Sequence, residues 1–277
     1  MPVFIASLNS GSNGNCYYVG NENEAVLVDV GISCREVEKR MQRLGLDMHK
    51  IRAIFISHEH TDHISGLSVT AHKYKLPVYI TGQTFRNTNI TLREDQVITF
   101  NAILPVAVGN LSIKAFQKHH DASDPHSFVV SSSTGISVGV FTDIGNPCRE
   151  LIYHFKQCHA AFLESNYDEE MLMNGKYPYF LKNRIRGGLG HLSNAQAFQL
   201  FTEHRPTFMS HLLLAHLSKD NNCPKLVEDL FCSHGSDTHI VIASRFQETP
   251  VFEIKENTKS INRQSFYPQQ QVQLSLF

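Results

Sequence analysis

Within the six residues His58-Glu59-His60-Thr61-Asp62-His63, four side chains are good candidates to bind metal ions: His58, His60, Asp62 and His63. On a regular helix or strand they could not all face one point, whereas a loop could fold them around ions. Imidazole and carboxylate ligands suit zinc, manganese or iron, and the lack of thiolates is typical of an exchangeable site rather than a structural one. The alternative is a polar surface loop that carries histidines by chance.

The segments on either side of this motif can position it. Residues 51–56 are β-branched and apolar, which predicts a strand that ends at the motif, and a helix is expected near 64–75, ending before Pro77. Upstream, residues 25–28 predict a buried strand that ends in Asp29-Val30-Gly31. A loop between a strand and a helix is a common setting for catalytic residues, so the context favours a metal site over chance.

The rest of the chain mixes short apolar segments with helix signals. Further strands are expected at 3–6, 16–19, 78–80, 96–108, 111–118, 127–131, 136–142, 160–163, 208–214, 239–243 and 250–254, and helices at 34–44, 147–157, 194–203 and about 223–233. Ser33 can cap the first of these helices, and Pro224 suits the first turn of the last. Such mixing in two similar halves predicts an α/β (α+β) fold, a four-layer αββα sandwich with two mixed sheets face to face and helices outside.

Overall composition restricts the function only broadly. The chain has 277 residues, enough to bury one large core, and its net charge of -1 does not require a polyanionic partner. Its six cysteines are scattered and form no CxxC pair, which indicates reduced thiols. No segment has the length and apolarity of a signal peptide or membrane span, so a cytoplasmic location without membrane contact is expected.

An HxHxDH motif after a strand, preceded by a strand that ends in Asp-x-Gly, resembles the signature of the metallo-β-lactamase superfamily. The resemblance implies two divalent metal ions per chain, zinc or manganese, with iron as a third candidate. It implies that Asp143 bridges the two ions and that Asp29 supports the metal-binding loop from behind. The implied ligands are His58, His60 and His120 for the first ion, and Asp62, His63 and His216 for the second.

Two neighbours compete with His120 as the third ligand of the first ion. If His119 and His120 both lie on a strand, only one of them can face the metals. The string His120-Asp121-Ala122-Ser123-Asp124-Pro125 favours His120, and His126 is a weaker competitor.

Further strings resemble the YycJ/WalJ-type proteins of this superfamily over about residues 3–245. They are LNSGSNGN (8–15), HDASDP (120–125), LESNYD (163–168), GHLSN (190–194) and HLSKDNN (216–222). Because these proteins resemble exonucleases, the likeness implies a phosphodiesterase that degrades DNA from the 5′ end in repair or replication. Asp62 is then expected to serve catalysis as well as metal binding.

GHLSN is similar to the histidine motif of RNase Z-like phosphodiesterases, whose acidic partner corresponds to Glu164. A carboxylate bonded to His191 would favour the protonated imidazole, which suits a proton donor to the leaving sugar oxygen. The two ions would activate the attacking water and polarise a phosphate oxygen. The alternative is that His191 only helps to cap the helix that begins at Ser193.

Three cations precede GHLSN, namely Lys182, Arg184 and Arg186, and they are placed to hold flanking phosphates. A solvated basic turn is the alternative.

At about residue 256 the composition becomes rich in Gln, Asn and Ser, which predicts a catalytic domain over 1–255 and a flexible tail over 256–277. Residues 273–277 resemble the peptide by which bacterial DNA-processing proteins bind the replication sliding clamp. The contacts would come from Gln273, Leu274, Leu276 and Phe277. Packing of this peptide against the domain is the alternative.

Two other functions compete with the nuclease. The same metals could hydrolyse a small molecule, such as a thioester, a lactone or a cyclic phosphodiester. Relatives of that kind usually carry Gly-His-Thr-Pro-Gly at the third histidine, where this chain has HDASDP. A non-catalytic adaptor bound to the clamp is disfavoured because every expected ligand is present.

Overall fold

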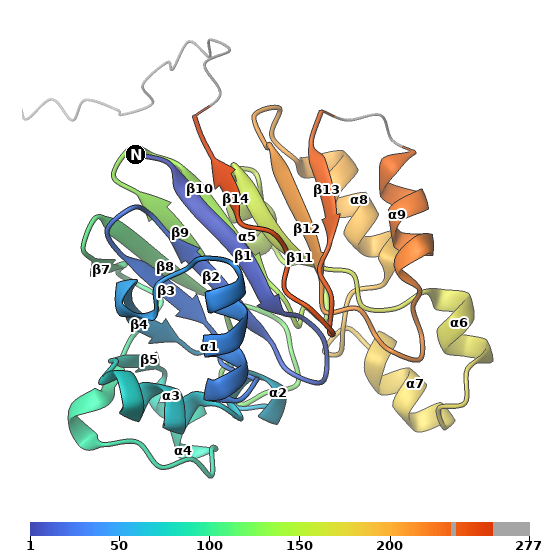
Figure 1. Ribbon diagram of the computed structural model, residues 1–277. Coiled ribbons are helices and arrows are strands. Elements are labelled where there is room, and N and C mark those ends of the chain that lie inside the picture. Colours follow the sequence, from blue (N-terminus) through green and yellow to red (C-terminus); the bar gives the residue numbers. More distant parts are fainter. Residues whose placement is uncertain (234–236, 257–277) are drawn as a thin grey trace, which may run out of the picture.

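The computed structural model describes residues 1–233 and 237–256. Within these residues, two seven-stranded sheets lie face to face, and helices cover their outer faces (Figure 1). This arrangement confirms the predicted αββα sandwich. None of the helices in the described ranges is long and apolar enough to cross a bilayer. The predicted tail beyond Glu256, including the peptide 273–277, lies outside the described residues.

The strands of each sheet are neighbours in the order β14-β1-β2-β3-β4-β5-β6 and β13-β12-β11-β10-β9-β8-β7. The first sheet contains β1 (Val3–Asn9), β2 (Cys16–Gly20), β3 (Ala25–Val28), β4 (Ile51–Phe55), β5 (Val78–Ile80), β6 (Val97–Thr99) and β14 (Phe252–Ile254). The second contains β7 (Val106–Val108), β8 (Leu111–Gln117), β9 (His126–Ser132), β10 (Ser137–Phe141), β11 (Ala160–Glu164), β12 (His211–Ala215) and β13 (His239–Ile242).

The two sheets repeat one pattern of strand pairing. The run β14-β1-β2-β3 is antiparallel and β3-β4-β5-β6 is parallel. In the second sheet, β7-β8-β9-β10 is antiparallel and β10-β11-β12-β13 is parallel. Thus β3 corresponds to β10, and β4 corresponds to β11. Both β3 and β10 are followed by an aspartate with positive φ, namely Asp29 at 60° after β3 and Asp143 at 55° after β10.

The helices outside the sheets are α1 (Cys34–Arg43), α2 (Thr61–Ile64), α3 (Leu67–Tyr74), α4 (Gly82–Arg86), α5 (Arg149–Phe155), α6 (Glu169–Asn174), α7 (Tyr179–Arg186), α8 (Asn194–His204) and α9 (Pro224–Cys232), with 3-10 turns at Met48–Lys50 and Glu94–Gln96. Two predicted helix starts are confirmed: the Ser33 side chain accepts a hydrogen bond from the Glu36 amide, and Pro224 lies in the first turn of α9.

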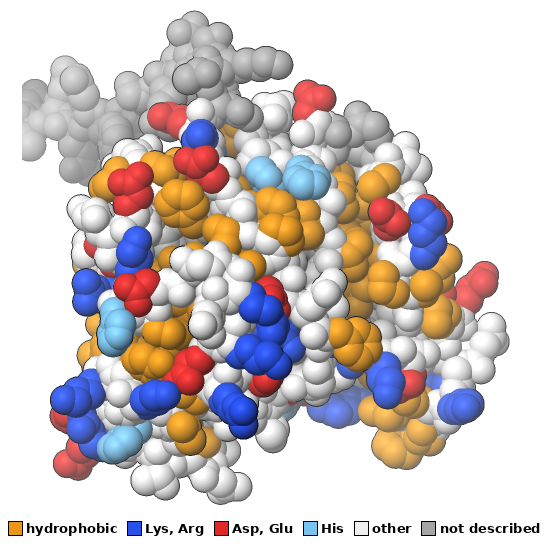
Figure 2. Space-filling model, in the orientation of Figure 1, with side chains coloured by type: hydrophobic (Ala, Val, Ile, Leu, Met, Phe, Trp, Pro, Cys, Tyr) orange, Lys and Arg blue, Asp and Glu red, His pale blue; other side chains and the backbone are white. Residues whose placement is uncertain are grey.

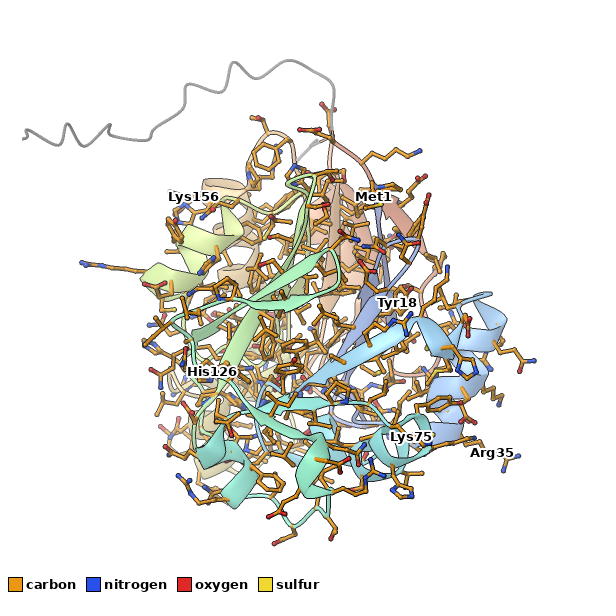
Figure 3. All side chains as sticks on the ribbon, turned by 90° about the vertical axis from the view of Figure 1, so that its left-hand side faces the viewer. Met1, Tyr18, Arg35, Lys75, His126 and Lys156 are labelled. Atoms are coloured by element: carbon orange, nitrogen blue, oxygen red, sulfur yellow. The ribbon has the colours of Figure 1, made fainter. Side chains whose placement is uncertain are left out.

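Apolar side chains form three layers, one between the sheets and one beneath the helices on each outer face. Between the sheets, Phe55 packs edge-on against Phe128, and Tyr17 packs against Phe162. Figure 3 shows the sandwich with its side chains from the side, with Arg35 on α1 and Lys156 after α5 extending from opposite flanks. This buried sandwich gives the strand ends a rigid frame.

Some predicted elements were wrong. The single strand expected at 96–108 is two strands, because β6 belongs to the first sheet and β7 to the second, and the chain crosses between the sheets at 100–105. The helix expected near 64–75 is broken between α2 and α3 at Gly66, where an added Cβ would lie 1.8 Å from the Ile32 carbonyl oxygen. Helices α4, α6 and α7 were not predicted.

Candidate metal centre

The predicted ligands meet where several strands end. His58, His60, Asp62 and His63 follow β4, while Asp143 follows β10 and His216 follows β12. His120 comes from the loop after β8, and Glu164 is the last residue of β11. We call the set His58, His60, Asp62, His63, His120, Asp143 and His216 the ligand cluster. Parallel strands place their carboxyl ends at one edge, so the topology gathers these distant residues.

The backbone is strained at this edge. Four residues other than glycine have positive φ in the described ranges, and three of them are Asp29, Asp143 and His216, at 60°, 55° and 56°. The fourth, Lys75, ends α3. Such conformations cost about 1–3 kcal/mol each and gather at functional sites. Asp143 and His216 belong to the cluster, and Asp29 contacts it through His63.

Three imidazoles form the first half of the ligand cluster. His58 Nε2 lies 3.0 Å from His60 Nδ1, which lies 3.4 Å from His120 Nε2. Burial lowers the pKa of His58 well below its usual value and that of His120 to about 4, so these two rings are neutral, as metal ligands must be. His119 is exposed, so the structure brings His120 to the cluster and not its neighbour.

Hydrogen bonds orient two of these rings from behind. His58 Nδ1 lies 2.9 Å from Ser57 Oγ, and His120 Nδ1 lies 2.9 Å from the Gly190 carbonyl oxygen. These contacts leave Nε2 of both rings facing the cluster. Partners of this kind fix the tautomer and direction of metal-binding histidines.

Asp62, His63 and His216 form the second half. Oδ2 of Asp62 lies 3.5 Å from His63 Nε2 and 3.4 Å from His216 Nε2. The carboxylate of Asp143 lies between the two halves: Oδ2 is 3.1 Å from His63 Nε2, and Oδ1 is 3.9 Å from His120 Nε2. Its place fits the predicted bridging role.

Two buried polar atoms test whether cations fit this cluster. Among the described residues, Asp143 Oδ2 and His216 Nε2 have no hydrogen-bond partner, although both are close to other polar atoms. The 3.1 Å contact from Asp143 to His63 is close enough for an ion pair but lacks hydrogen-bond geometry. Leaving such groups unpaired costs about 1–3 kcal/mol each. Triads drawn from the cluster place candidate ligand atoms within 4.8 Å of one another, so the donors fit divalent cations.

Charge in the second half is balanced by protons when no cation is bound. Burial alone would lower the pKa of His216, but the carboxylates of Asp143, Asp62 and Glu164 raise it to about 10. Burial opposes the charged form of His63 too, yet nearby carboxylates, with that of Asp143 foremost, raise its pKa well above the usual value. Both imidazoles therefore carry protons that a cation would have to replace.

Asp29 lies behind the cluster, in contact with His63 and Ser57. Its Oδ2 lies 2.7 Å from His63 Nδ1 and accepts a hydrogen bond from Ser57 Oγ, while Oδ1 accepts one from the Ser57 amide. Asp29 and His63 are completely buried. A carboxylate behind a histidine raises its basicity and fixes the nitrogen that faces the metal.

Two supporting residues were missed from the sequence. The Asn15 side-chain amide donates to Asp62 Oδ2 at 3.1 Å. Asn15 belongs to the LNSGSNGN string, which supported the family resemblance but was given no role in the site. Lys118 is buried and donates to the Thr142 carbonyl, next to Asp143. Burial lowers the pKa of Lys118, although the surrounding carboxylates oppose this. In the sequence, only its position directly before His119 could have drawn attention to Lys118.

The predicted pair of Glu164 and His191 is present in the structure. Glu164 Oε1 lies 2.8 Å from His191 Nδ1, and it also lies 3.0 Å from His216 Nδ1. Burial would raise the pKa of Glu164, but the two imidazoles lower it to about 2, so it is ionised. Glu164 is completely buried, whereas the His191 side chain is 23% exposed. The sequence analysis did not anticipate that one carboxylate serves two histidines.

A cavity of about 420 Å³ opens beside the ligand cluster, and we call it the metal cavity. It is lined by His60, Asp62, His120, Asp143 and His216 of the cluster, together with His191 and Arg184. Arg184 Nε lies 2.5 Å from Asp121 Oδ2. Lys182 instead donates to the Met173 carbonyl, and Arg186 contacts Asn183 and the Met173 sulfur, so neither lines this cavity.

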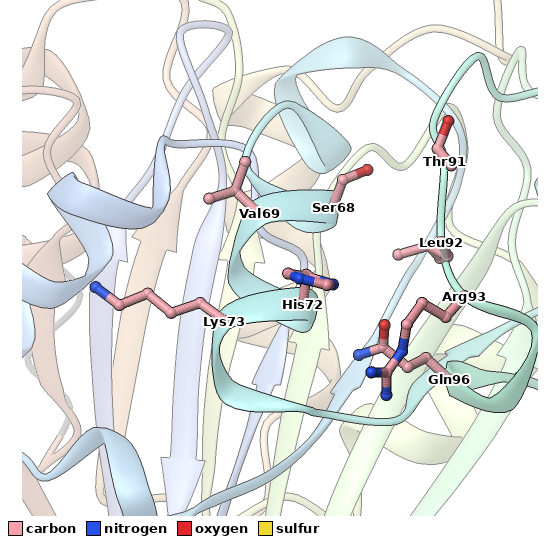
Figure 4. A pocket seen from close by; sticks show the side chains of 8 residues that line it. All are labelled: Ser68, Val69, His72, Lys73, Thr91, Leu92, Arg93 and Gln96. Atoms are coloured by element: carbon pink, nitrogen blue, oxygen red, sulfur yellow. The ribbon is translucent and has the colours of Figure 1, made fainter.

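Another pocket, of about 390 Å³, lies between α3 and residues 91–96 (Figure 4). Its lining includes His72 and Lys73 but no carboxylate. With one imidazole and no acidic ligand, it cannot hold a pair of divalent cations. The candidate metal ligands instead surround the metal cavity.

Comparison with known proteins gives both a family and relatives. Residues 24–216 match the β-lactamase superfamily domain. Exodeoxyribonuclease YycJ of Bacillus anthracis is 34% identical over 229 residues, which cover 82% of this chain and 86% of that protein. Exodeoxyribonuclease WalJ of Streptococcus pneumoniae serotype 2 (strain D39) is 31% identical over 224 residues, 79% and 83% of the two chains.

A solved structure agrees with this result at the level of fold. The metallo-β-lactamase fold protein YhfI from Bacillus subtilis superposes with a TM-score of 0.68 at 15% identity, covering 90% of this chain and 100% of that one. The family match spans the cluster up to His216, and the relatives align over most of the chain. The protein is therefore an enzyme, a metal-dependent hydrolase that belongs to the metallo-β-lactamase superfamily and, within it, to the YycJ/WalJ-type family.

Proposed function

We propose that this protein is a binuclear metal-dependent phosphodiesterase that acts as a DNA exonuclease from the 5′ end, in DNA repair or replication. The observation that carries the proposal is the position of His191, which lines the metal cavity while Glu164 holds its Nδ1 atom. The names of the relatives, both exodeoxyribonucleases, support DNA as the substrate.

The ligand cluster would hold two cations, zinc or manganese, with iron as a third candidate. His58, His60 and His120 would bind the first cation and Asp62, His63 and His216 the second, with Asp143 shared between them. When bound, such a pair lowers the pKa of a water and neutralises charge on phosphate oxygens. Asp62, whose carboxylate lines the cavity, would also help to orient that water.

His191 would supply the proton that the leaving sugar oxygen needs. Because Nδ1 is held by Glu164, the other ring nitrogen, Nε2, can face the cavity. The negative charge of Glu164 stabilises the protonated imidazole before transfer and fixes its direction. The capping alternative for His191 is weakened by the capping box of α8, which Ser193 and Gln196 complete by themselves.

Arg184 is the basic residue best placed to hold a phosphate beside the scissile bond, since it lines the metal cavity and its guanidinium is anchored by Asp121. Lys182 and Arg186 on the same helix would contact phosphates further along the strand. All three are interpreted as binding residues that act on the substrate backbone.

The C-terminal segment would serve a different purpose. We propose that residues 1–255 form the catalytic domain and that residues 256–277 form a tail, which binds the replication sliding clamp through Gln273, Leu274, Leu276 and Phe277. Such a tether would bring a cytoplasmic nuclease to newly made DNA ends. Two leucines and a phenylalanine suit apolar pockets, with the glutamine setting the register.

A direct assay tests the proposed function. The purified protein is incubated with Mn²⁺ or Zn²⁺ and DNA labelled at its 5′ or 3′ end, single- or double-stranded, and His60→Ala and His191→Ala serve as controls. Release of labelled mononucleotide from the 5′ end, lost in both variants, is expected. Metal-dependent turnover of a cyclic phosphodiester, a thioester or a lactone without cleavage of DNA would instead favour the small-molecule hydrolase.

A further inference from the structure

A second hollow of about 340 Å³ adjoins the metal cavity, and we call it the side pocket. Ser218 lines both spaces, so they meet at this residue. Its volume lies within the range of small-ligand sites, about 300–1,000 Å³. Its lining comes from three segments: Ser10 after β1, residues between Leu217 and Pro224, and residues from Ile242 to Phe246. Ser10 and residues 217–222 lie in strings to which the sequence analysis assigned no role apart from that of His216.

The lining of the side pocket combines apolar and charged residues. Leu217, Pro224, Ile242 and Ala243 supply apolar surface. Lys219 and Arg245 bring positive charge, and Arg245 Nη2 lies 2.5 Å from the Leu217 carbonyl oxygen. A nucleotide base, which is a flat ring with polar edges linked to a phosphate, matches this combination of apolar surface and positive charge.

Phe246 lines the side pocket, and its side chain is exposed although its backbone is tied down. The residue is 79% exposed. Its amide donates to Ser244 Oγ at 3.1 Å, and its carbonyl accepts from Arg40 Nη2 at 3.4 Å. Arg40 is buried and is itself held by Leu8 and Asn9. An aromatic ring presented to water from an anchored backbone is a ready surface for stacking.

We infer that the side pocket receives a nucleoside next to the scissile phosphate, with its base stacked on Phe246. This inference rests on the proposed function and extends it: the strand would pass from the metal cavity over Ser218 into the side pocket. Lys219 and Arg245 would neutralise the phosphate on the far side of that nucleoside. A base held there must be unpaired, so the substrate end is a single strand or is opened on binding.

A second exposed aromatic surface competes for the same strand. Tyr179 and Phe180 on α7 are 67% and 74% exposed, and Figure 2 shows hydrophobic side chains flanked by Lys and Arg over this helix. Neither residue lines the metal cavity or the side pocket. We favour Phe246 because its pocket shares the lining residue Ser218 with the metal cavity.

The test compares Phe246→Ala with Phe246→Tyr on single-stranded DNA, by the initial rate of the first cleavage. Loss of one stacked base raises KM about tenfold. The tyrosine variant should retain the wild-type KM. Two further substrates each lack one base, on one or the other of the two nucleotides that flank the scissile phosphate. One of these two abasic positions should raise the wild-type KM about tenfold and leave the KM of Phe246→Ala unchanged.

Two matched variants and one truncation complete the design. Tyr153→Ala removes an exposed aromatic from α5, away from both pockets, and should behave as wild type. An unchanged KM in Phe246→Ala, or a larger rise in Phe180→Ala, would overturn the inference while DNA cleavage by the wild type still stands. The truncation tests whether residues 257–277 fill the side pocket. If they do, deleting them would lower the KM of the protein with Phe246 but not the KM of Phe246→Ala, and this result would also overturn the inference. No DNA cleavage by the wild type would overturn the inference and the proposed function together.

Discussion

His191 and His216 are joined through a single carboxylate oxygen, since their Nδ1 atoms lie 2.8 and 3.0 Å from Oε1 of Glu164. The other oxygen, Oε2, accepts the amides of Ile144 and Leu192, which lie in the loops after β10 and before α8. The proposed proton donor and a proposed metal ligand are thus oriented by one buried side chain. Changes at Glu164 should disturb catalysis and metal binding together.

Glu164→Gln tests this link. The amide is nearly the same size but carries no charge, so it stabilises protonated His191 less well. We expect kcat for DNA hydrolysis to fall by about 100-fold. Metal affinity should weaken about tenfold because His216 loses its partner. Steady-state kinetics and metal titration measure both. Glu203→Gln, at an exposed position on α8, is the control, and equal kinetics in the two variants would contradict the shared role.

His191→Ala should lower kcat for DNA by about 100-fold while the bound metal is retained. The loss should shrink to a few-fold for a nucleotide p-nitrophenyl ester, whose leaving group needs no proton. His204→Ala, at the end of α8, is the matched control. A loss of the same size for both substrates would show that His191 does not act as the acid.

Metal binding should release protons. His216, with its pKa raised to about 10, and His63, with its pKa raised well above the usual value, are both protonated at pH 7 in the metal-free protein. Ligation requires neutral imidazole, so about two protons should leave per chain, and affinity should rise with pH until these groups are neutral. Calorimetry in buffers of different ionisation enthalpy measures this number. His216→Ala should release about one proton fewer. A binding enthalpy independent of the buffer would contradict the prediction.

Asp29→Ala removes one buried partner of protonated His63. The free energy of unfolding of the metal-free protein should fall by about 3–5 kcal/mol, because the Nδ1 atom of His63 loses its carboxylate and the buried Ser57 amide loses its acceptor. Urea denaturation at pH 7 provides the measurement. Asp95→Ala, which breaks an exposed pair with Arg93, should cost less than about 1 kcal/mol. Equal losses in the two variants would argue against the buried pair.

Removal of residues 273–277 should abolish binding to a bacterial sliding clamp and leave turnover of short DNA intact. The measurement is surface plasmon resonance with the immobilised clamp, alongside the exonuclease assay. Leu276→Ala should weaken binding in the full chain, since it removes one apolar anchor. Undiminished binding by the truncated protein would rule out this peptide as the contact.

Local patterns predicted much of the fold, and the resemblance of motifs named the residues of the ligand cluster. The strand before His58, the Ser33 cap and Pro224 depend on residues close together in the chain, so they could be predicted without knowing the tertiary structure. The division of 96–108 between two sheets could not, because the pairing of β6 with β5 and of β7 with β8 is decided by distant strands. Helix α7 was missed because its signals resemble those of a basic turn.

Within the site, the ligands that follow a motif could be named, whereas their partners could not. Asp29, Asp143 and His216 all occur in recognisable strings. The contact between Lys118 and Thr142 joins the ends of β8 and β10, 24 residues apart, and leaves no local pattern. The sharing of Glu164 by two histidines depends on the parallel pairing of β11 with β12, which places Glu164 opposite Ala215, directly before His216.

The most direct test of the central claim is anomalous diffraction from crystals grown with Mn²⁺ or Zn²⁺. Two peaks about 3.5–4 Å apart are expected. One should be bound by His58, His60 and His120 and the other by Asp62, His63 and His216, with Asp143 contacting both. A single peak, or two peaks outside these residues, would contradict the binuclear centre.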